Sequence, residues 1–166
     1  MEEISLIEVN DKQSIALVEA LAGEIWHEHY AHILDKSQIK YMTEKFQSKE
    51  AIFEQIKEGY KYYLITCGEN YSGYLSIIFK VDYLFLSKIY LKSNSRGKGI
   101  GRQVLEFVEK IAKEQELARI KLTVNKNNIN TIKAYKKWGF EITDSVVSDI
   151  GNGFVMDDYV MEKIIS

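Results

Sequence analysis

A short basic segment rich in glycine is the first place in this sequence where residue types and spacing point to chemistry. It reads Arg96-Gly97-Lys98-Gly99-Ile100-Gly101 and is followed by Arg102. Glycine lacks a Cβ atom, so its backbone can adopt positive φ angles and approach a bulky ligand closely. Main-chain N–H groups exposed in such a turn, next to the positive end of a helix dipole, bind anions. We therefore expect this segment to be a phosphate-binding turn.

The spacing of the glycines excludes two common phosphate-binding motifs. A P-loop requires Ser or Thr directly after a Gly-Lys pair, and the Gly97-x-Gly99-x-Gly101 spacing differs from a dinucleotide fingerprint. Charge favours an anionic ligand, because residues 80–140 contain 14 Lys and Arg against 5 Asp and Glu. The pI of about 6.0 and the lack of a nucleic-acid-binding motif favour a small phosphorylated molecule over a nucleic acid. The alternative is a glycine-rich loop that only precedes a helix.

A second polar segment further along the chain has helical spacing. Asn128, Thr131 and Tyr135 are three and four residues apart, so they share one face of a predicted helix over residues 128–138. Gly139 is placed to end that helix, and Phe140 to begin the next strand. The residues alone leave two interpretations of Tyr135: a functional hydroxyl, or a tyrosine packed against the core.

Together the two segments resemble the GNAT acetyltransferase family. The run KIYLKSNSRGKGIG, residues 88–101, is similar to that family's fourth strand and acetyl-CoA loop, and NINTIKAYKKWGF, residues 128–140, to its fourth helix. The segment Trp26-His27-Glu28-His29-Tyr30 and the strand predicted near residues 155–161 resemble the bacterial polyamine-acetylating branch. The sequence departs from the family pattern at Ser93, where proline is frequent, and at Thr131, where alanine is usual.

The resemblance implies direct acetyl transfer from the cosubstrate acetyl-CoA to a primary amine, with no metal. The backbone of Ile89, Tyr90 and Leu91 would contact the pantetheine arm, and Asn128 would contact the pantetheine or the thioester. Tyr135 would be the catalytic acid, because a phenol hydroxyl can protonate a departing thiolate. The pyrophosphate would be bound by the phosphate turn and the arginine after it: Arg96, Gly97, Lys98, Gly99, Ile100, Gly101 and Arg102.

The acceptor side is predicted to include Trp26, Glu28 and Tyr30. Outside residues 80–140 the chain contains 19 acidic and 8 basic residues, which suits a small cationic amine such as a polyamine. An alkylamine is protonated at neutral pH, so a base must remove its proton. Glu24, His27, Glu28 and His29 are candidates, each equally explained as a solvated surface residue, and the sequence does not identify the base. Trp26 and Tyr30 are equally explained as core residues.

The elements expected around these residues form an α+β fold. Hydrophobic periodicity and turn residues predict the order β-α-α-β-β-β-α-β-α-β-β, a mixed and mostly antiparallel central sheet flanked by helices. Asp11 and Ser48 are the expected N-caps of the early helices, with an interruption near residues 34–36. No proline, repeat or linker interrupts the chain, so we expect one acetyltransferase domain over residues 1–166.

The composition and the first residues of the chain bear on the cellular compartment in which the protein is expected. The first residues are acidic, no apolar h-region follows, and no apolar run approaches the ~18 residues of a membrane span. The single cysteine, Cys67, cannot form an intrachain disulfide. We expect a cytoplasmic monomer or homodimer that binds neither membranes nor nucleic acid.

Three other functions remain open at this point. The acceptor can be a protein N-terminus or a lysine side chain in place of a small amine. The protein can be a non-catalytic acetyl-CoA sensor, although a sensor has no need of the acid Tyr135. The third is a regulatory protein that binds a phosphorylated ligand without thioester chemistry.

Overall fold

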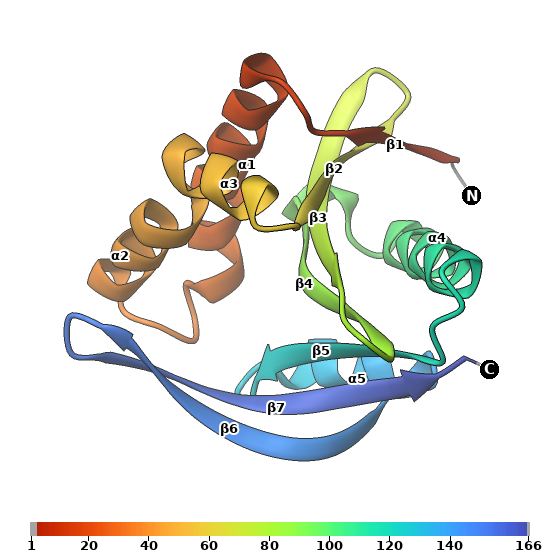
Figure 1. Ribbon diagram of the computed structural model, residues 1–166. Coiled ribbons are helices and arrows are strands. Elements are labelled where there is room, and N and C mark those ends of the chain that lie inside the picture. Colours follow the sequence, from red (N-terminus) through yellow and green to blue (C-terminus); the bar gives the residue numbers. More distant parts are fainter. Residues whose placement is uncertain (1–2, 166) are drawn as a thin grey trace. The chain divides into compact units, whose positions relative to one another are not determined.

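The computed structural model describes residues 3–165 and contains the expected alternation of strands and helices (Figure 1). Its strands are β1 (Ile4–Glu8), β2 (Lys61–Cys67), β3 (Asn70–Phe79), β4 (Tyr83–Leu91), β5 (Arg119–Asn125), β6 (Glu141–Gly151) and β7 (Phe154–Ile164). Its helices are α1 (Lys12–Tyr30), α2 (Lys36–Gln47), α3 (Lys49–Lys57), the short 3-10 helix η1 (Ser93–Ser95), α4 (Ile100–Glu114) and α5 (Ile129–Lys137).

The helix boundaries follow the local signals in the sequence. Asp11 caps α1 through a capping box, with the Ser14 N–H donating to the Asp11 carboxylate at 2.8 Å. Ser48 caps α3 by accepting from the Ala51 N–H at 3.2 Å. The expected order contained two helices after the first strand, whereas the structure has three. The interruption predicted near residues 34–36 separates α1 from α2, and the Ser48 cap then starts a third helix.

The strand order is β1-β2-β3-β4-β5-β7-β6. Pairing is antiparallel between β1 and β2, β2 and β3, β5 and β7, and β6 and β7. In contrast, β4 and β5 are parallel, and their ladder extends only from Tyr83 opposite Arg119 to Phe85 opposite Lys121. This mixed, mostly antiparallel sheet confirms the predicted fold class.

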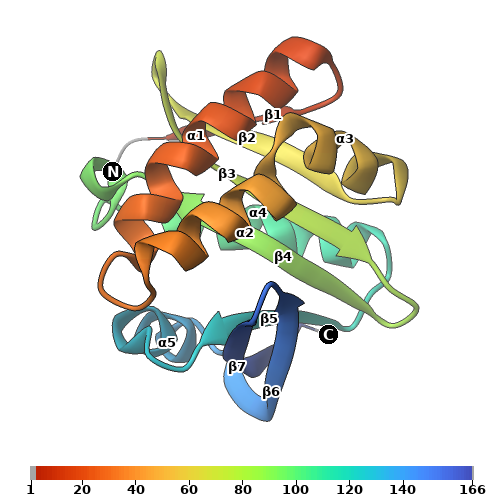
Figure 2. The same cartoon turned by 90° about the vertical axis from the view of Figure 1, so that its left-hand side faces the viewer.

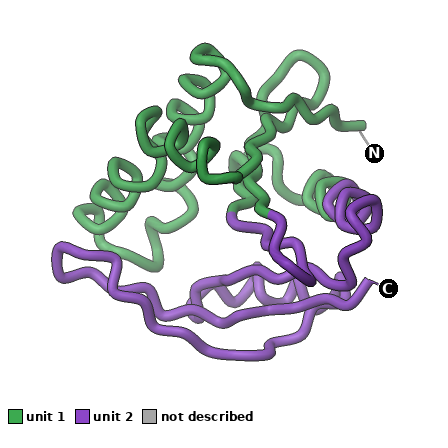
Figure 3. Tube along the Cα trace, viewed as in Figure 1, with its two compact units in different colours: residues 1–78, 88–105 green, residues 79–87, 106–166 purple. Residues whose placement is uncertain are grey.

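Two compact units can be distinguished in the chain (Figure 3). Unit 1 comprises residues 1–78 and 88–105, and unit 2 comprises residues 79–87 and 106–166. In unit 1, α1, α2 and α3 contact one another (Figure 2) and bury Val18, Ile25 and Ile52. In unit 2, the buried residues include Ile120, Leu122 and Met161 of the β5–β7 ladder. The chain passes three times between the units: at the end of β3, within β4 and within α4.

Candidate active site

The glycine-rich turn lies in unit 1 between η1 and α4, where the sequence predicted it. Gly97 and Gly99 have φ angles of +76° and +78°, a region that side chains with a Cβ rarely adopt. A Cβ added to Gly97 would have no atom within 4 Å, so open space lies beside this backbone. The Gln103 N–H donates to the Gly99 carbonyl at 3.2 Å, which starts the helical ladder of α4 there.

The start of α4 adds further donors to the turn. Ile100, the first residue of α4, is buried in unit 1, and this holds the start of the helix in place. Gly101 follows it in the first helical turn. The first N–H groups of a helix have no partner within it, and the helix dipole makes this end positive. The exposed side chains of Arg96 and Lys98 add positive charge on the turn. The turn thus has the donors, the charge and the open space that a diphosphate requires.

The end of β4 leads directly into this turn. The Arg96 guanidinium donates to the Leu91 carbonyl at 3.2 Å, and the Lys92 N–H donates to the Ser72 carbonyl of β3 at 2.8 Å. At the neighbouring Gly73, a Cβ would lie 2.0 Å from the Tyr90 carbonyl oxygen. Only a glycine allows β3 to come this close to β4, so Gly73 helps to set the position of Tyr90 and Leu91.

The C-terminal half of α1 is tied to the same loop. The exposed Glu28 carboxylate accepts from the Ser93 N–H at 3.2 Å, at the start of η1. One turn earlier, Glu24 forms an ion pair with Lys92 at 3.7 Å. Two of the predicted acceptor-side acids therefore contact the loop that follows β4.

An aromatic cluster in unit 1 contains Trp26 and Tyr30, which are both buried. The Trp26 Nε1 group donates to the Tyr74 hydroxyl at 2.7 Å, and the hydroxyls of Tyr30 and Tyr90 are 3.0 Å apart. The rings of Trp26 and Tyr30 have centroids 5.5 Å apart, as their spacing on one helix face predicted. These contacts agree with the core interpretation of both residues, and a role in acceptor binding stays a prediction.

His29 packs at the edge of this cluster. Its ring contacts those of Tyr30 and Tyr90, with centroid distances of 4.6 and 5.3 Å. Burial, and to a lesser degree the positive charge of Arg96, lower the pKa of His29 to about 4. His29 is therefore neutral at physiological pH.

A buried polar group in unit 1 was missed by the sequence reasoning. Gln47 is fully buried and joins two tyrosines: its amide donates to the Tyr62 hydroxyl at 3.1 Å and accepts from the Tyr74 hydroxyl at 2.6 Å. The Lys88 ammonium lies 3.4 Å from the Gln55 side-chain oxygen, and burial lowers the pKa of Lys88 to about 8. The sequence did contain a signal for Lys88: it lies on the same face of β4 as the buried Leu84 and Leu86, where a charged residue is unusual.

Tyr135 lies on α5 in unit 2 and is buried, with only 7% of its surface exposed. Its ring packs against those of Trp138 and Phe140, at centroid distances of 6.1 and 5.5 Å. Gly139 ends the helix at a φ of +97°, and the Phe140 N–H donates to the Tyr135 carbonyl at 3.0 Å. Asn128 is at the N-cap of the same helix. The predicted residues of this segment thus share one short helix.

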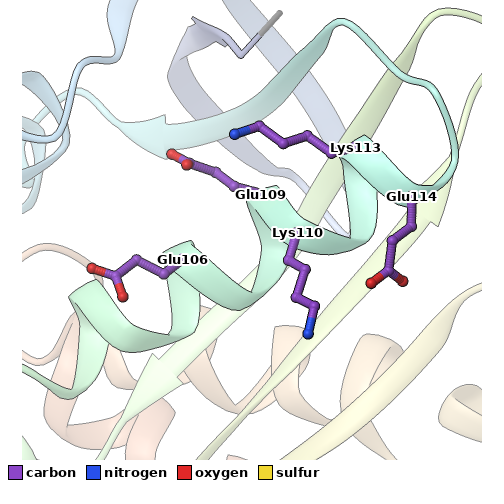
Figure 4. A pocket seen from close by; sticks show the side chains of 5 residues that line it. All are labelled: Glu106, Glu109, Lys110, Lys113 and Glu114. Carbon is purple, nitrogen blue, oxygen red and sulfur yellow. The ribbon is translucent and has the colours of Figure 1, made fainter.

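Each unit contains a hollow on its surface. In unit 1, about 330 Å³ lies beside the phosphate turn, lined by Cys67, Asn70, Tyr71, Ser72, Lys92, Asn94, Ser95, Lys98 and Ile100. In unit 2, an open hollow of about 490 Å³ runs along one flank of α4 (Figure 4). The second is lined by Glu106, Glu109, Lys110, Lys113 and Glu114. These alternating charges of a single helix are typical of a solvated surface, and we assign them no chemistry.

Residues 3–165 contain neither a candidate membrane span nor a candidate metal site. No helix in this range has the length and apolar character needed to cross a bilayer. Over the same residues, no group of three His, Cys, Asp or Glu side chains is arranged to bind a metal ion.

Comparison with known proteins identifies the class to which this fold and turn belong. Residues 10–140 match the model of the acetyltransferase (GNAT) family, so the chain belongs to that family. Acetyl-CoA is accordingly its cosubstrate, and its reaction is the transfer of an acetyl group. The family resemblance, the fold class and the cosubstrate predicted from the sequence are confirmed.

Relatives similar to this chain include spermidine and spermine acetyltransferases. A spermidine N(1)-acetyltransferase of Thermoplasma acidophilum is 25% identical over 97% of this chain and 96% of its own length. A spermine/spermidine N(1)-acetyltransferase of Bacillus subtilis is 29% identical, over 35% of this chain and 39% of its own length. Among solved structures, the PaiA N-acetyltransferase of Thermoplasma acidophilum in complex with coenzyme A superposes with a TM-score of 0.83, at 23% identity and 98% coverage of this chain and 99% of that protein.

Proposed function

We propose that this acetyltransferase acetylates a primary amine of a small cationic molecule, with polyamines as the first candidates. The observation that carries the proposal is the similarity to a spermidine N(1)-acetyltransferase, which extends over almost the whole of both chains. The acidic excess outside residues 80–140 supports it, because a polyamine carries several positive charges. We propose further that residues 1–166 act as one domain in the cytoplasm, as a monomer or homodimer.

The cosubstrate would be bound through the backbone of the phosphate turn. The N–H groups of residues 97–101 would donate to the pyrophosphate, with Arg96 and Arg102 adding charge. Hydrogen bonds to charged groups contribute roughly 1.5–3 kcal/mol each, so three or four suffice to bind a diphosphate. Ile89, Tyr90 and Leu91 would pair with the pantetheine amides, because the β4–β5 ladder ends before them at Phe85.

The remaining proposed residues act on the reacting groups. Bound acetyl-CoA supplies an activated acyl group and a thiolate leaving group. Asn128 would contact the pantetheine or the thioester, and Tyr135 would donate its hydroxyl proton to the leaving sulfur. Trp26, Glu28 and Tyr30 belong to the acceptor side in this proposal. An alkylamine with a pKa of about 10.4 must lose a proton first, which costs roughly 4.6 kcal/mol at pH 7.

The direct test is the release of coenzyme A thiol from acetyl-CoA over a panel of amines: spermidine, spermine, amino acids and peptides. We expect the polyamines to have a kcat/KM at least tenfold above that of any peptide or amino acid. Because Cys67 lies at a hollow and can react with a thiol reagent, the assay should use Cys67→Ser as well as the parent chain.

Three results would contradict the proposal. A peptide as the best acceptor would indicate a protein acetyltransferase. Bound acetyl-CoA with no thiol release over the whole panel would indicate a sensor. Failure to bind acetyl-CoA in calorimetry would remove the assignment of the phosphate turn itself.

A further inference from the structure

Asp158 of β7, in unit 2, has a half-buried side chain, and one of its carboxylate oxygens lacks a hydrogen bond among the described residues. Its Oδ1 oxygen is shielded from solvent and has no hydrogen-bond partner among residues 3–165. Buried polar atoms in native proteins are nearly always hydrogen-bonded, and an exception calls for an explanation. A carboxylate in this situation is stabilised when a cation or a hydrogen-bond donor arrives.

The charged groups around Asp158 do not supply that partner. Asp157, its neighbour on the strand, forms an ion pair with Lys126 at 2.8 Å. Burial is the main cause that raises the pKa of Asp158 to about 6, the charge of Asp157 adds to it, and Lys126 acts in the opposite direction. Asp158 is thus poised to exchange a proton near neutral pH, whereas Asp157 is exposed and already paired.

The position of Asp158 connects it to the residues assigned to the reaction. In the β5–β7 ladder it lies directly opposite Asn125, the last residue of β5, and the two share one face of the sheet. The Asn125 carbonyl accepts from the Asn128 N–H at 2.9 Å, which ties this end of β5 to the start of α5. Tyr135 is on that same helix. Asp158 therefore lies at the strand end from which the helix of the proposed acid begins.

The other face of the ladder has a different role. Residues opposite each other in this ladder, such as Leu122 and Met161, are buried and form core. Asp158 and Asn125 alternate with these core positions and lie on the opposite face. Packing therefore gives no reason for a carboxylate at position 158.

We propose that the Asp158 carboxylate binds the ammonium group of the acceptor amine and takes its proton. This inference rests on the proposed function, amine acetylation. The ammonium transfers one proton to Asp158, and the nitrogen lone pair forms the C–N bond while the C–S bond breaks. Tyr135 gives its hydroxyl proton to the departing sulfur and recovers a proton from the new amide nitrogen. Asp158 releases its proton to solvent, so one proton leaves for each amide formed.

The test compares Asp158→Asn with the matched control Asp157→Asn, both in the full chain. We expect Asp158→Asn to lower kcat/KM for the preferred amine by at least about a hundredfold, in the range of general-base effects. The affinity for acetyl-CoA in calorimetry should stay within twofold. Asp157→Asn, which removes the same charge one residue away, should stay within threefold of the parent in kcat/KM.

The pH profile separates a catalytic carboxylate from a structural one. In the parent, kcat/KM should fall below about pH 6 as Asp158 becomes protonated, and this acidic limb should be absent from the residual activity of Asp158→Asn. An Asp158→Asn variant within threefold of the parent, or one that keeps the acidic limb, overturns the inference while leaving amine acetylation intact. A parent chain inactive on every amine would instead refute the proposed function.

Thermal stability gives a second, independent readout. The pKa of Asp158 is about 6 in the folded chain and 3.8 for an ordinary aspartate, so between these values the folded chain keeps a proton that the unfolded chain has lost. Ionised Asp158 therefore destabilises the fold above about pH 6, and Asp158→Asn should have a higher Tm than the parent at pH 7.5. A lower Tm at that pH would mean that Asp158 is a structural residue, which also overturns the inference.

Discussion

Gly73 of β3 allows a sharp prediction about the strand that leads into the phosphate turn. A Cβ at this position would lie 2.0 Å from the Tyr90 carbonyl oxygen and 3.0 Å from the Leu91 Cα atom. Non-bonded heavy atoms normally approach to about 3.5 Å, so Gly73→Ala must move β3 and β4 apart by more than about 1 Å. Both obstructing atoms are main chain, and a rotamer change cannot relieve the contact.

The expected cost of Gly73→Ala can be worked from these contacts. Overpacking of a closely packed site costs about 1–3 kcal/mol. The adjacent hydrogen bond from the Lys92 N–H to the Ser72 carbonyl, 2.8 Å long, is strained or lost by the same movement. Its loss adds about 0.5–1.5 kcal/mol. The total of roughly 2–4 kcal/mol corresponds to a fall in Tm of roughly 5–15 °C for a chain of this length.

Gly23 provides the matched control for this substitution. It lies inside α1, and a Cβ added there has no atom within 4 Å. Gly23→Ala should therefore stabilise the protein by about 0.5–1 kcal/mol, because alanine is the better helix former. The two variants carry the same chemical change and are predicted to have opposite signs.

Denaturant unfolding and acetyl-CoA titration measure the outcome. Gly73→Ala should lower the unfolding midpoint without changing the slope m, and should weaken acetyl-CoA binding because Tyr90 and Leu91 move. Gly23→Ala should raise the midpoint and leave binding unchanged. If Gly73→Ala were as stable as the parent, or if both variants lost the same stability, the close approach of β3 to β4 would be refuted.

Three further predictions concern the acid, the turn and the buried histidine. Tyr135→Phe keeps the ring contacts with Trp138 and Phe140 and should lower kcat by about 10²–10⁴, with acetyl-CoA affinity within about twofold in calorimetry; full activity would show that another group is the acid. Gly99→Val places a β-branched residue at a φ of +78° and should weaken acetyl-CoA binding at least tenfold; unchanged affinity would refute the backbone site. The pKa of His29 is about 4 in the folded chain and 6.5 for an ordinary histidine, so between these values the unfolded chain binds an extra proton and stability should fall as pH drops from 6.5 to 4. His29→Gln should reduce that loss in denaturant midpoints measured across the range, and an identical pH dependence would contradict the burial of His29.

Features that depend on near neighbours in the chain were determined by the sequence itself. The Asp11 and Ser48 caps, the glycine-rich turn with Gly97 and Gly99 at positive φ, and the end of α5 at Gly139 all formed where predicted. Each of these depends on backbone angles and hydrogen bonds within a few residues. A local pattern is enough to specify them, and the two local motifs together sufficed to place the chain in its family.

What each side chain contacts was decided by tertiary structure. Glu28 was expected on the acceptor side, and the structure places its carboxylate on the N–H of Ser93, 65 residues away. Trp26 donates to Tyr74 across a separation of 48 residues. Asp158 had no local signal beyond its charge in a strand, and only the register of β7 against β5 shows that it faces Asn125. Strand register and helix packing bring such residues together, and both depend on the whole hydrophobic core, which no local segment of the sequence specifies.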